Sequence, residues 1–184
     1  MRRATAAFLL LLLSACTAAR GAVAIPSDEI PFSLARSAAP QGPAAPTAQY
    51  TLAFVRRGRL IDITKELSAR APQEAVMTAL LDGPTTREAE RLIGTEIPTQ
   101  TRLLQVRVVG TIAEVNLSRE FQAAGPRESV LLRVAQVVRT LTSTKGVSSV
   151  EFLIDGVFVG VPTDSGVVDR PVTTADYQSV RPAA

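Results

Sequence analysis

Apolar and polar positions alternate in three pairs of short segments, and each pair is joined by residues that favour tight turns. A period of two places successive side chains on opposite faces of a β-strand. The turn residues are Arg57-Gly58, Gly110 and Asp155-Gly156, so the pattern predicts three β-hairpins. Their strands are expected over residues 50–55 and 60–63, 103–109 and 111–117, and 150–154 and 157–161.

Between the first two hairpins, apolar residues recur at helical spacing. Pro72 suits the first turn of a helix, where its missing N–H costs nothing. Gly83 fits the position after the last turn, and Pro84 prevents the helix from continuing. A second, short helix is expected over residues 86–93, ended by Gly94.

The longest predicted helix spans residues 127–143. Its valines and leucines lie on one face, which we expect to pack against a sheet, while Arg127, Glu128 and Arg133 are expected to point away from that face. Gly146 follows the helix, and Lys145 lies near the negative end of its dipole.

The order of elements is strand-strand-helix-strand-strand-helix-strand-strand. This order predicts an α+β fold, a single two-layer domain in which a mostly antiparallel sheet carries the two main helices on one face. The helix over residues 127–143 could instead deliver its strand parallel to an earlier one. Residues 162–184 are polar and show no pattern until Tyr177, so we expect a C-terminal tail outside the domain of residues 50–161.

The amino terminus has the features of a secretory signal. Arg2 and Arg3 precede an apolar run over residues 6–13, which is about half the length of a membrane-spanning helix. Small residues then lead to Cys16, the one cysteine of the chain. The ending Leu-Ser-Ala-Cys resembles the lipobox of bacterial lipoproteins, and the alternative is an ordinary signal peptide followed by a chance cysteine.

The lipobox resemblance implies that residues 1–15 are removed and that Cys16 carries a diacylglyceryl group. Two acyl chains hold a protein at a membrane, whereas one anchors it only marginally. We therefore expect a protein anchored to the outer face of the cytoplasmic membrane. Residues 16–49 are rich in Ala and Pro and are expected to form a tether with a reach of roughly 30 Å.

Composition excludes several classes of function. Removal of the two signal arginines lowers the formal charge from +3 to +1, so no nucleic-acid partner is implied. Histidine is absent, which excludes a Ser-His-Asp triad, and no glycine-rich phosphate loop occurs. A zinc site would have to consist of carboxylates alone, a poor match to zinc's preferences. We expect no cofactor, no metal site and no enzymatic activity.

A succession of short motifs resembles the GerMN domain, the sporulation and spore-germination module. The segment Ala79-Leu80-Leu81-Asp82-Gly83-Pro84-Thr85 is similar to its "LLxGPT" motif, and Ile97-Pro98 follows at the family's spacing. The same order continues with Val115-Asn116-Leu117-Ser118, Ala135-Gln136-Val137-Val138 and Ile154-Asp155-Gly156. Together the motifs cover residues 50–161.

The resemblance implies an α+β domain similar to the ring-building motifs of secretion and sporulation complexes. It also implies a binding or scaffolding role outside the cytoplasmic membrane. Two residues depart from the family pattern: Asn116 stands where Asp is frequent, and Val109 precedes Gly110 where an Asp-Gly turn is common. Both departures weaken any proposal of acidic chemistry at these positions.

The segment Asp82, Gly83, Pro84 and Thr85 is the candidate interaction surface, although the same residues also suit the end of a helix. The predicted function is an interaction or scaffolding module that binds an envelope protein or a second copy of itself, in sporulation, germination or envelope homeostasis. The alternative is a receptor for a small ligand such as a germinant or wall fragment. A receptor needs a concave pocket with convergent polar groups, and the sequence shows none.

A third hypothesis is a hydrolase that uses carboxylates, with Glu114, Glu120 and Asp155 as its candidates. Glu114 and Asn116 are expected on one face of a strand, opposite Ala113, Val115 and Leu117, because side chains alternate with a period of two. A polar surface patch is the simpler explanation of that face.

Overall fold

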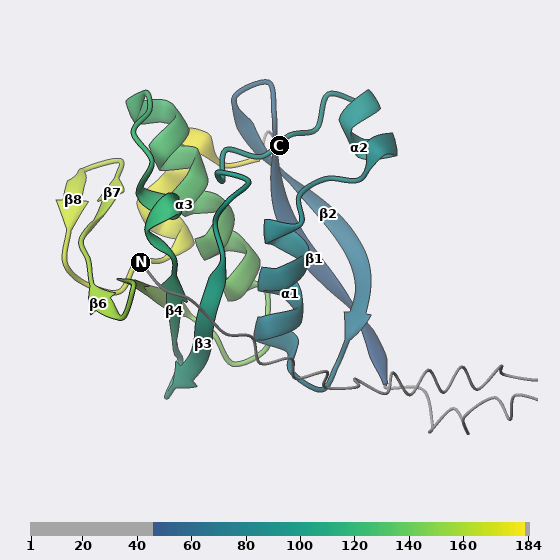
Figure 1. Ribbon diagram of the computed structural model, residues 1–184, viewed down its shortest axis with the longest axis horizontal. Coiled ribbons are helices and arrows are strands. Elements are labelled where there is room, and N and C mark those ends of the chain that lie inside the picture. Colours follow the sequence, from purple (N-terminus) through teal and green to yellow (C-terminus); the bar gives the residue numbers. More distant parts are fainter. Residues whose placement is uncertain (1–45, 183–184) are drawn as a thin grey trace, which may run out of the picture. The chain divides into compact units, whose positions relative to one another are not determined.

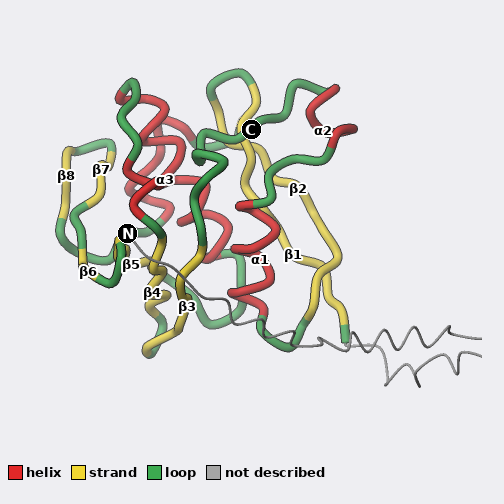
Figure 2. Tube along the Cα trace, in the orientation of Figure 1, coloured by secondary structure: helices red, strands yellow, loops and turns green. Residues whose placement is uncertain are grey.

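The computed structural model describes residues 46–182 (Figure 1). The predicted signal peptide, Cys16 and nearly all of the predicted tether lie outside these residues. The described part belongs to one compact unit of residues 43–184. It has the predicted α+β character, with hairpins and helices in the expected order (Figure 2).

The first hairpin pairs β1 (Thr47–Arg56) with β2 (Arg59–Ser68) in one uninterrupted register. Arg57 and Gly58 connect the strands with positive φ angles of 53° and 72°, the backbone of a turn that matches strand twist. β1 begins three residues before the predicted strand, at the position where the tether was expected to continue.

A four-stranded sheet has the order β3-β4-β5-β6. The strands are β3 (Leu103–Val109), β4 (Ile112–Leu117), β5 (Ser149–Ile154) and β6 (Val157–Phe158). β4 and β5 are parallel and the other pairs are antiparallel. The chain connects this parallel pair through α3 (Arg127–Thr142). The sequence had left open whether this helix is followed by a parallel strand, and the structure shows that it is.

The two long hairpins do not share a sheet. Helix α1 (Pro72–Leu81) lies between them in Figure 2, and a short helix α2 (Thr86–Glu90) follows it. The expected single sheet is therefore divided, and the described strands belong to three sheets. The short helix also ends earlier than the predicted residue 93.

Helix α3 explains the division, because its polar side chains occupy the outer edge of β1. The hydroxyl of Thr140 accepts a hydrogen bond from the backbone N–H of Ala53 at 2.9 Å. The amide of Gln136 donates to the carbonyl of Ala53 at 3.0 Å. Gln136 and Thr140 are both fully buried. A strand edge that has its hydrogen-bonding groups satisfied cannot pair with another strand.

The neighbouring groups on the same edge are satisfied too. Ser143, which directly follows α3, has its hydroxyl 2.9 Å from the carbonyl of Thr51 and 2.7 Å from the carbonyl of Thr140, so its one proton is shared between these two acceptors. At the other end, Val55 and Gly94 exchange two backbone hydrogen bonds of 2.8 Å each. Residues 136, 140 and 143 lie on one face of a helix, so a single helix face covers the edge.

The core is formed where α3 packs against the sheet and the first hairpin. The sheet contributes alternate residues of β4 and β5: Ala113, Val115, Leu117, Val150, Phe152 and Ile154. These alternate residues confirm the predicted inward face, and Glu114 and Asn116 lie on the opposite one. Helix α3 is buried around most of its circumference, rather than on one face, because other elements also pack on it.

Residues 162–182 correct the prediction of a C-terminal tail. They complete a small hairpin of β7 (Val161–Thr163) and β8 (Gly166–Val168) and form the 3₁₀ segment η2 (Thr174–Val180), which packs on α3. Val172, Tyr177 and Val180 are buried. These three separated apolar residues are too few to establish a helical or strand period, so the sequence pattern did not indicate that the segment is folded.

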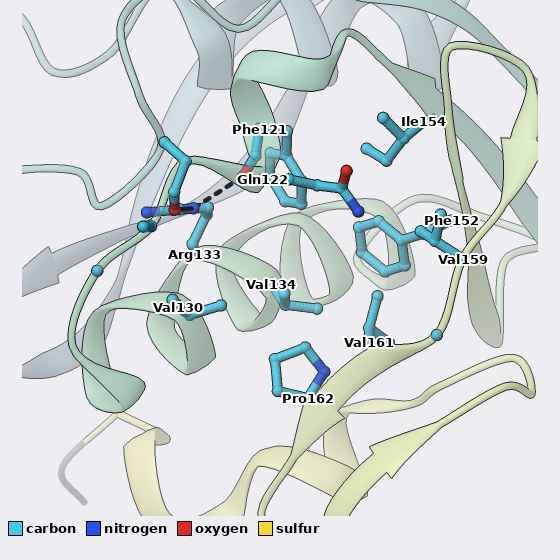
Figure 3. A pocket seen from close by; sticks show the side chains of 14 residues that line it. Phe121, Gln122, Val130, Arg133, Val134, Phe152, Ile154, Val159, Val161 and Pro162 are labelled. Carbon is cyan, nitrogen blue, oxygen red and sulfur yellow. Dashed lines mark hydrogen bonds between the residues drawn. The ribbon is translucent and has the colours of Figure 1, made fainter.

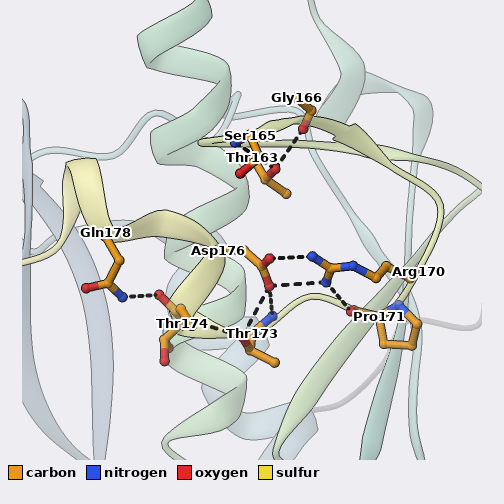
Figure 4. A network of polar contacts seen from close by, with 10 residues as sticks. Thr163, Ser165, Gly166, Arg170, Pro171, Thr173, Thr174, Asp176 and Gln178 are labelled. Atoms are coloured by element: carbon orange, nitrogen blue, oxygen red, sulfur yellow. Dashed lines mark hydrogen bonds and ion pairs between the residues drawn. The ribbon is translucent and has the colours of Figure 1, made fainter.

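A polar network fixes the start of η2 (Figure 4). Thr173 and Asp176 form a reciprocal capping box, and Arg170 donates to Asp176 at 2.6 Å. The hydrogen bonds from Arg170 lower the pKa of Asp176 although partial burial opposes this. The spacing Thr-x-x-Asp at residues 173–176 was the sequence signal that could have indicated this segment.

Candidate functional site

The predicted interaction loop connects two helices. Asp82 follows the last residue of α1, and Gly83 takes a positive φ of 80°, which favours glycine. Thr85 begins α2 through a capping box: its backbone N–H donates to Glu88 at 2.6 Å, and its hydroxyl accepts from the backbone N–H of Glu88 at 3.3 Å. The structural role expected for the loop is present, and a binding role for it stays a prediction.

The carboxylates of the hydrolase hypothesis come from three elements. Glu114 lies in β4 and forms an ion pair with Arg107 of β3 at 2.5 Å. Glu120 lies in the 3₁₀ segment η1 (Arg119–Gln122), and Asp155 occupies the turn after β5 with a φ of 47°. Within residues 46–182, no group of three or more His, Cys, Asp or Glu side chains is placed to hold a metal ion.

β3 is an edge strand of the four-stranded sheet. It pairs with β4 on one side, and on its other side no strand of the described chain is hydrogen-bonded to it. Three of its apolar side chains are exposed: Leu104 at 46%, Val108 at 39% and Val109 at 51%. The sequence identified this strand but could not show that it lies at the edge.

A cavity of about 320 Å³ lies among η1, α3, β5, the loop of residues 159–160 and the start of β7 (Figure 3). The rings of Phe121 and Phe152 stack in its wall with their centroids 5.9 Å apart. The remaining lining is mostly aliphatic and includes Val130, Val134, Ile154, Val159, Val161 and Pro162. Sequence reasoning missed this pocket, because its walls come from segments that are distant along the chain.

Arg133 is the one charged residue in the cavity wall, and its side chain corrects the prediction that it points away from the core. The residue is only 5% exposed. Its Nη1 donates to the carbonyls of Phe121 and Ala123 at 2.7 and 2.8 Å, and its Nε donates to the carbonyl of Glu96 at 3.0 Å. Because these carbonyls satisfy its donors, the guanidinium can be buried. Helical periodicity alone cannot indicate such partners from other segments.

None of the helices described is both long and apolar enough to span a bilayer.

Comparison with known proteins agrees with this fold. The family Germane, described as sporulation and spore germination, matches residues 40–160, and the chain belongs to this family. The GerMN resemblance seen in the motifs is thereby confirmed. Residues 161–182, which include Val161 and Pro162 of the cavity wall, lie beyond the matched range.

Solved structures share the fold at low sequence identity. A candidate lipoprotein of Clostridium perfringens is 17% identical with a TM-score of 0.52, covering 73% of this chain and 92% of that one. The first GerMN domain of the sporulation protein GerM of Bacillus subtilis is 19% identical with a TM-score of 0.54, covering 71% of this chain and all of that one.

The tandem GerMN domains of the same GerM protein are 16% identical with a TM-score of 0.55 over 75% of this chain, which spans 48% of the tandem. No curated protein matches the chain. At these identities the likeness concerns the fold.

Proposed function

We propose that this chain is a non-enzymatic interaction module of the cell envelope, anchored through a lipid on Cys16 to the outer face of the cytoplasmic membrane. It binds a strand of an envelope protein along the edge of β3. The family description supports a setting in sporulation or spore germination, and envelope homeostasis is the broader alternative.

The outer edge of β3 carries the proposal: no described strand pairs with it, although α1 packs against part of this strand. An edge strand presents a row of backbone N–H and C=O groups, and an added strand from a partner satisfies them while side-chain contacts supply specificity. Leu104, Val108 and Val109 place apolar surface beside this edge. Arg107 of β3 and Glu114 of β4 form an ion pair, which offers charged groups to a strand that binds at this edge.

Two features support the anchor. The lipobox-like ending at Cys16 supplies the attachment residue, and the Ala/Pro-rich residues 16–49 supply a tether. The structural relative from Clostridium perfringens is itself described as a candidate lipoprotein.

The chemistry of the chain supports a binding role. It has no histidine, and its single cysteine is the lipid attachment residue. Glu114 is engaged with Arg107, so this carboxylate already has a structural partner. Binding through a strand edge requires no catalytic group.

Site-specific photo-crosslinking in cells tests the proposal. A photoreactive amino acid at Val109 is expected to capture one discrete envelope protein, identified by mass spectrometry. The matched control places it at Val167, an apolar residue of β8 that is 73% exposed and lies on another sheet. Cys16→Ala is expected to reduce capture, because the chain is no longer held at the membrane.

The outcomes separate the possible partners. Capture of the chain itself at Val109 would replace the heterologous partner with a second copy. Equal capture from Val109 and Val167, or none from either, would overturn the assignment of β3.

A further inference from the structure

Nη2 of Arg133 has no acceptor among residues 46–182, whereas Nε and Nη1 donate to three backbone carbonyls. No carboxylate of the described residues lies within ion-pair distance of this guanidinium, since none of their ion pairs includes Arg133. Desolvation lowers the pKa of Arg133, and the charge of Glu96 only partly opposes this. The carbonyls account for two of the three nitrogens, and Nη2 is left without an acceptor among the described residues.

That donor group lies at the cavity. Nη2 would be 3.8 Å from a Cβ atom added at Gly125, a residue of the cavity wall, and Arg133 itself lines the same space. In Figure 3 the hydrogen bond from Arg133 to Phe121 lies on one side of the cavity, and Val161 and Pro162 lie on the other. The space therefore combines an aliphatic and aromatic wall with a single buried cation.

We infer that this cavity binds a small aliphatic carboxylate, with the carboxylate on Nη2 of Arg133 and the aliphatic part against Phe121, Phe152 and Val134. One cation balances one negative charge, and no second lysine or arginine lines the cavity to balance a phosphate dianion. A guanidinium binds a carboxylate through charge-assisted hydrogen bonds. The site is separate from β3 and goes beyond the proposed function.

The volume limits the size of the ligand. A cavity of about 320 Å³ suits a small ligand. Ligand pockets of this kind begin at about 300 Å³ and use a few polar groups to orient an apolar body. Octanoate has the required size and charge. The same chemistry occurs at the carboxyl terminus of a peptide that ends in an apolar residue.

Titration followed by ¹H–¹⁵N NMR tests the inference on residues 17–184, which contain the whole compact unit of residues 43–184 and omit the lipidated cysteine. Octanoate is added below its micelle concentration. We expect saturable shifts at residues 121–125 and 159–162. Octan-1-ol, which keeps the apolar chain and lacks the charge, is expected to bind at least tenfold more weakly. N-acetyl-leucine, compared with octanoate, distinguishes a peptide terminus from a fatty acid.

A blocking variant locates the site. Gly125 is exposed, does not have a positive φ, and can accept a Cβ at ordinary contact distance from Arg133 and Val130. Gly125→Leu is expected to fill the mouth of the cavity and weaken octanoate binding at least tenfold. Gln100→Leu, which adds leucine at another exposed loop residue, is expected to leave binding unchanged. The inference would be overturned by any of three results: equal affinity for octanoate and octan-1-ol, unchanged octanoate binding in Gly125→Leu, or absence of saturable shifts.

Discussion

The outer edges of β1 and β3 both present backbone N–H and C=O groups, but only those of β1 are hydrogen-bonded by other parts of the described chain. From Thr51 to Val55, the edge of β1 receives hydrogen bonds from helix α3 and from Gly94. The edge of β3 receives none from another described strand and carries exposed apolar side chains. The difference shows that polar residues of a helix can satisfy the hydrogen-bonding groups of a sheet edge, whereas β3 packs beside α1 and no described strand pairs with its outer edge.

Gln136→Leu should have the largest effect, because it removes the most central contact of the closed edge. The glutamine donates to the carbonyl of Ala53 and accepts from the backbone N–H of Glu96. Leaving one buried and one partly buried group without partners is expected to lower the free energy of unfolding by about 2–4 kcal/mol. Urea denaturation measures this. Gln100→Leu, at an exposed position, is the control, and an equal loss in both variants would contradict the role of Gln136.

Thr140→Val should have the next largest effect. Valine keeps the shape of threonine but cannot accept the hydrogen bond from the backbone N–H of Ala53. We expect a loss of about 2 kcal/mol in the free energy of unfolding. Thr101 offers the opposite case, because its buried hydroxyl has no partner among the described residues. Thr101→Val should be neutral or stabilising, and a loss equal to that of Thr140→Val would show that shape, not the hydrogen bond, matters.

Ser143→Ala should have a smaller effect on the same edge. Its hydroxyl shares one proton between the carbonyls of Thr51 and Thr140, and the contact with Thr51 is exposed to solvent. Water can replace the lost donor, so the expected loss is about 0.5 kcal/mol in the same denaturation experiment. A loss as large as that of Thr140→Val would mean that the edge is closed to water along its whole length.

Val109→Lys should have the smallest effect on stability and a large effect on binding. Lysine at an exposed edge position is expected to change the free energy of unfolding by no more than about 0.5 kcal/mol. A charge on an edge strand opposes strand addition, so capture of the envelope partner should be lost. Denaturation and crosslinking from a photoreactive residue at Gln105 measure the two effects. Retained capture would place the partner elsewhere.

Local pattern determined most of the elements. Alternation and the turn residues Arg57-Gly58 and Asp155-Gly156 predicted two hairpins that the structure contains, because strand period and turn geometry are properties of neighbouring residues. The last strand is shorter than the predicted residues 157–161, because β6 ends at Phe158 and Val161 begins β7 in another sheet. The apolar spacing likewise predicted α1 and α3 to within a residue or two. The capping role of the loop at residues 82–85 was also visible from its residue types.

Tertiary structure alone decided which edge is closed and where the cavity lies. The edge of β1 depends on hydrogen bonds between residues more than 80 positions apart, and the burial of Arg133 depends on carbonyls of Glu96, Phe121 and Ala123. The C-terminal segment folds because three isolated apolar residues meet a core formed elsewhere. Periodicity reports which face of an element is apolar, whereas pairing and burial depend on contacts between distant segments, and a local pattern does not contain them.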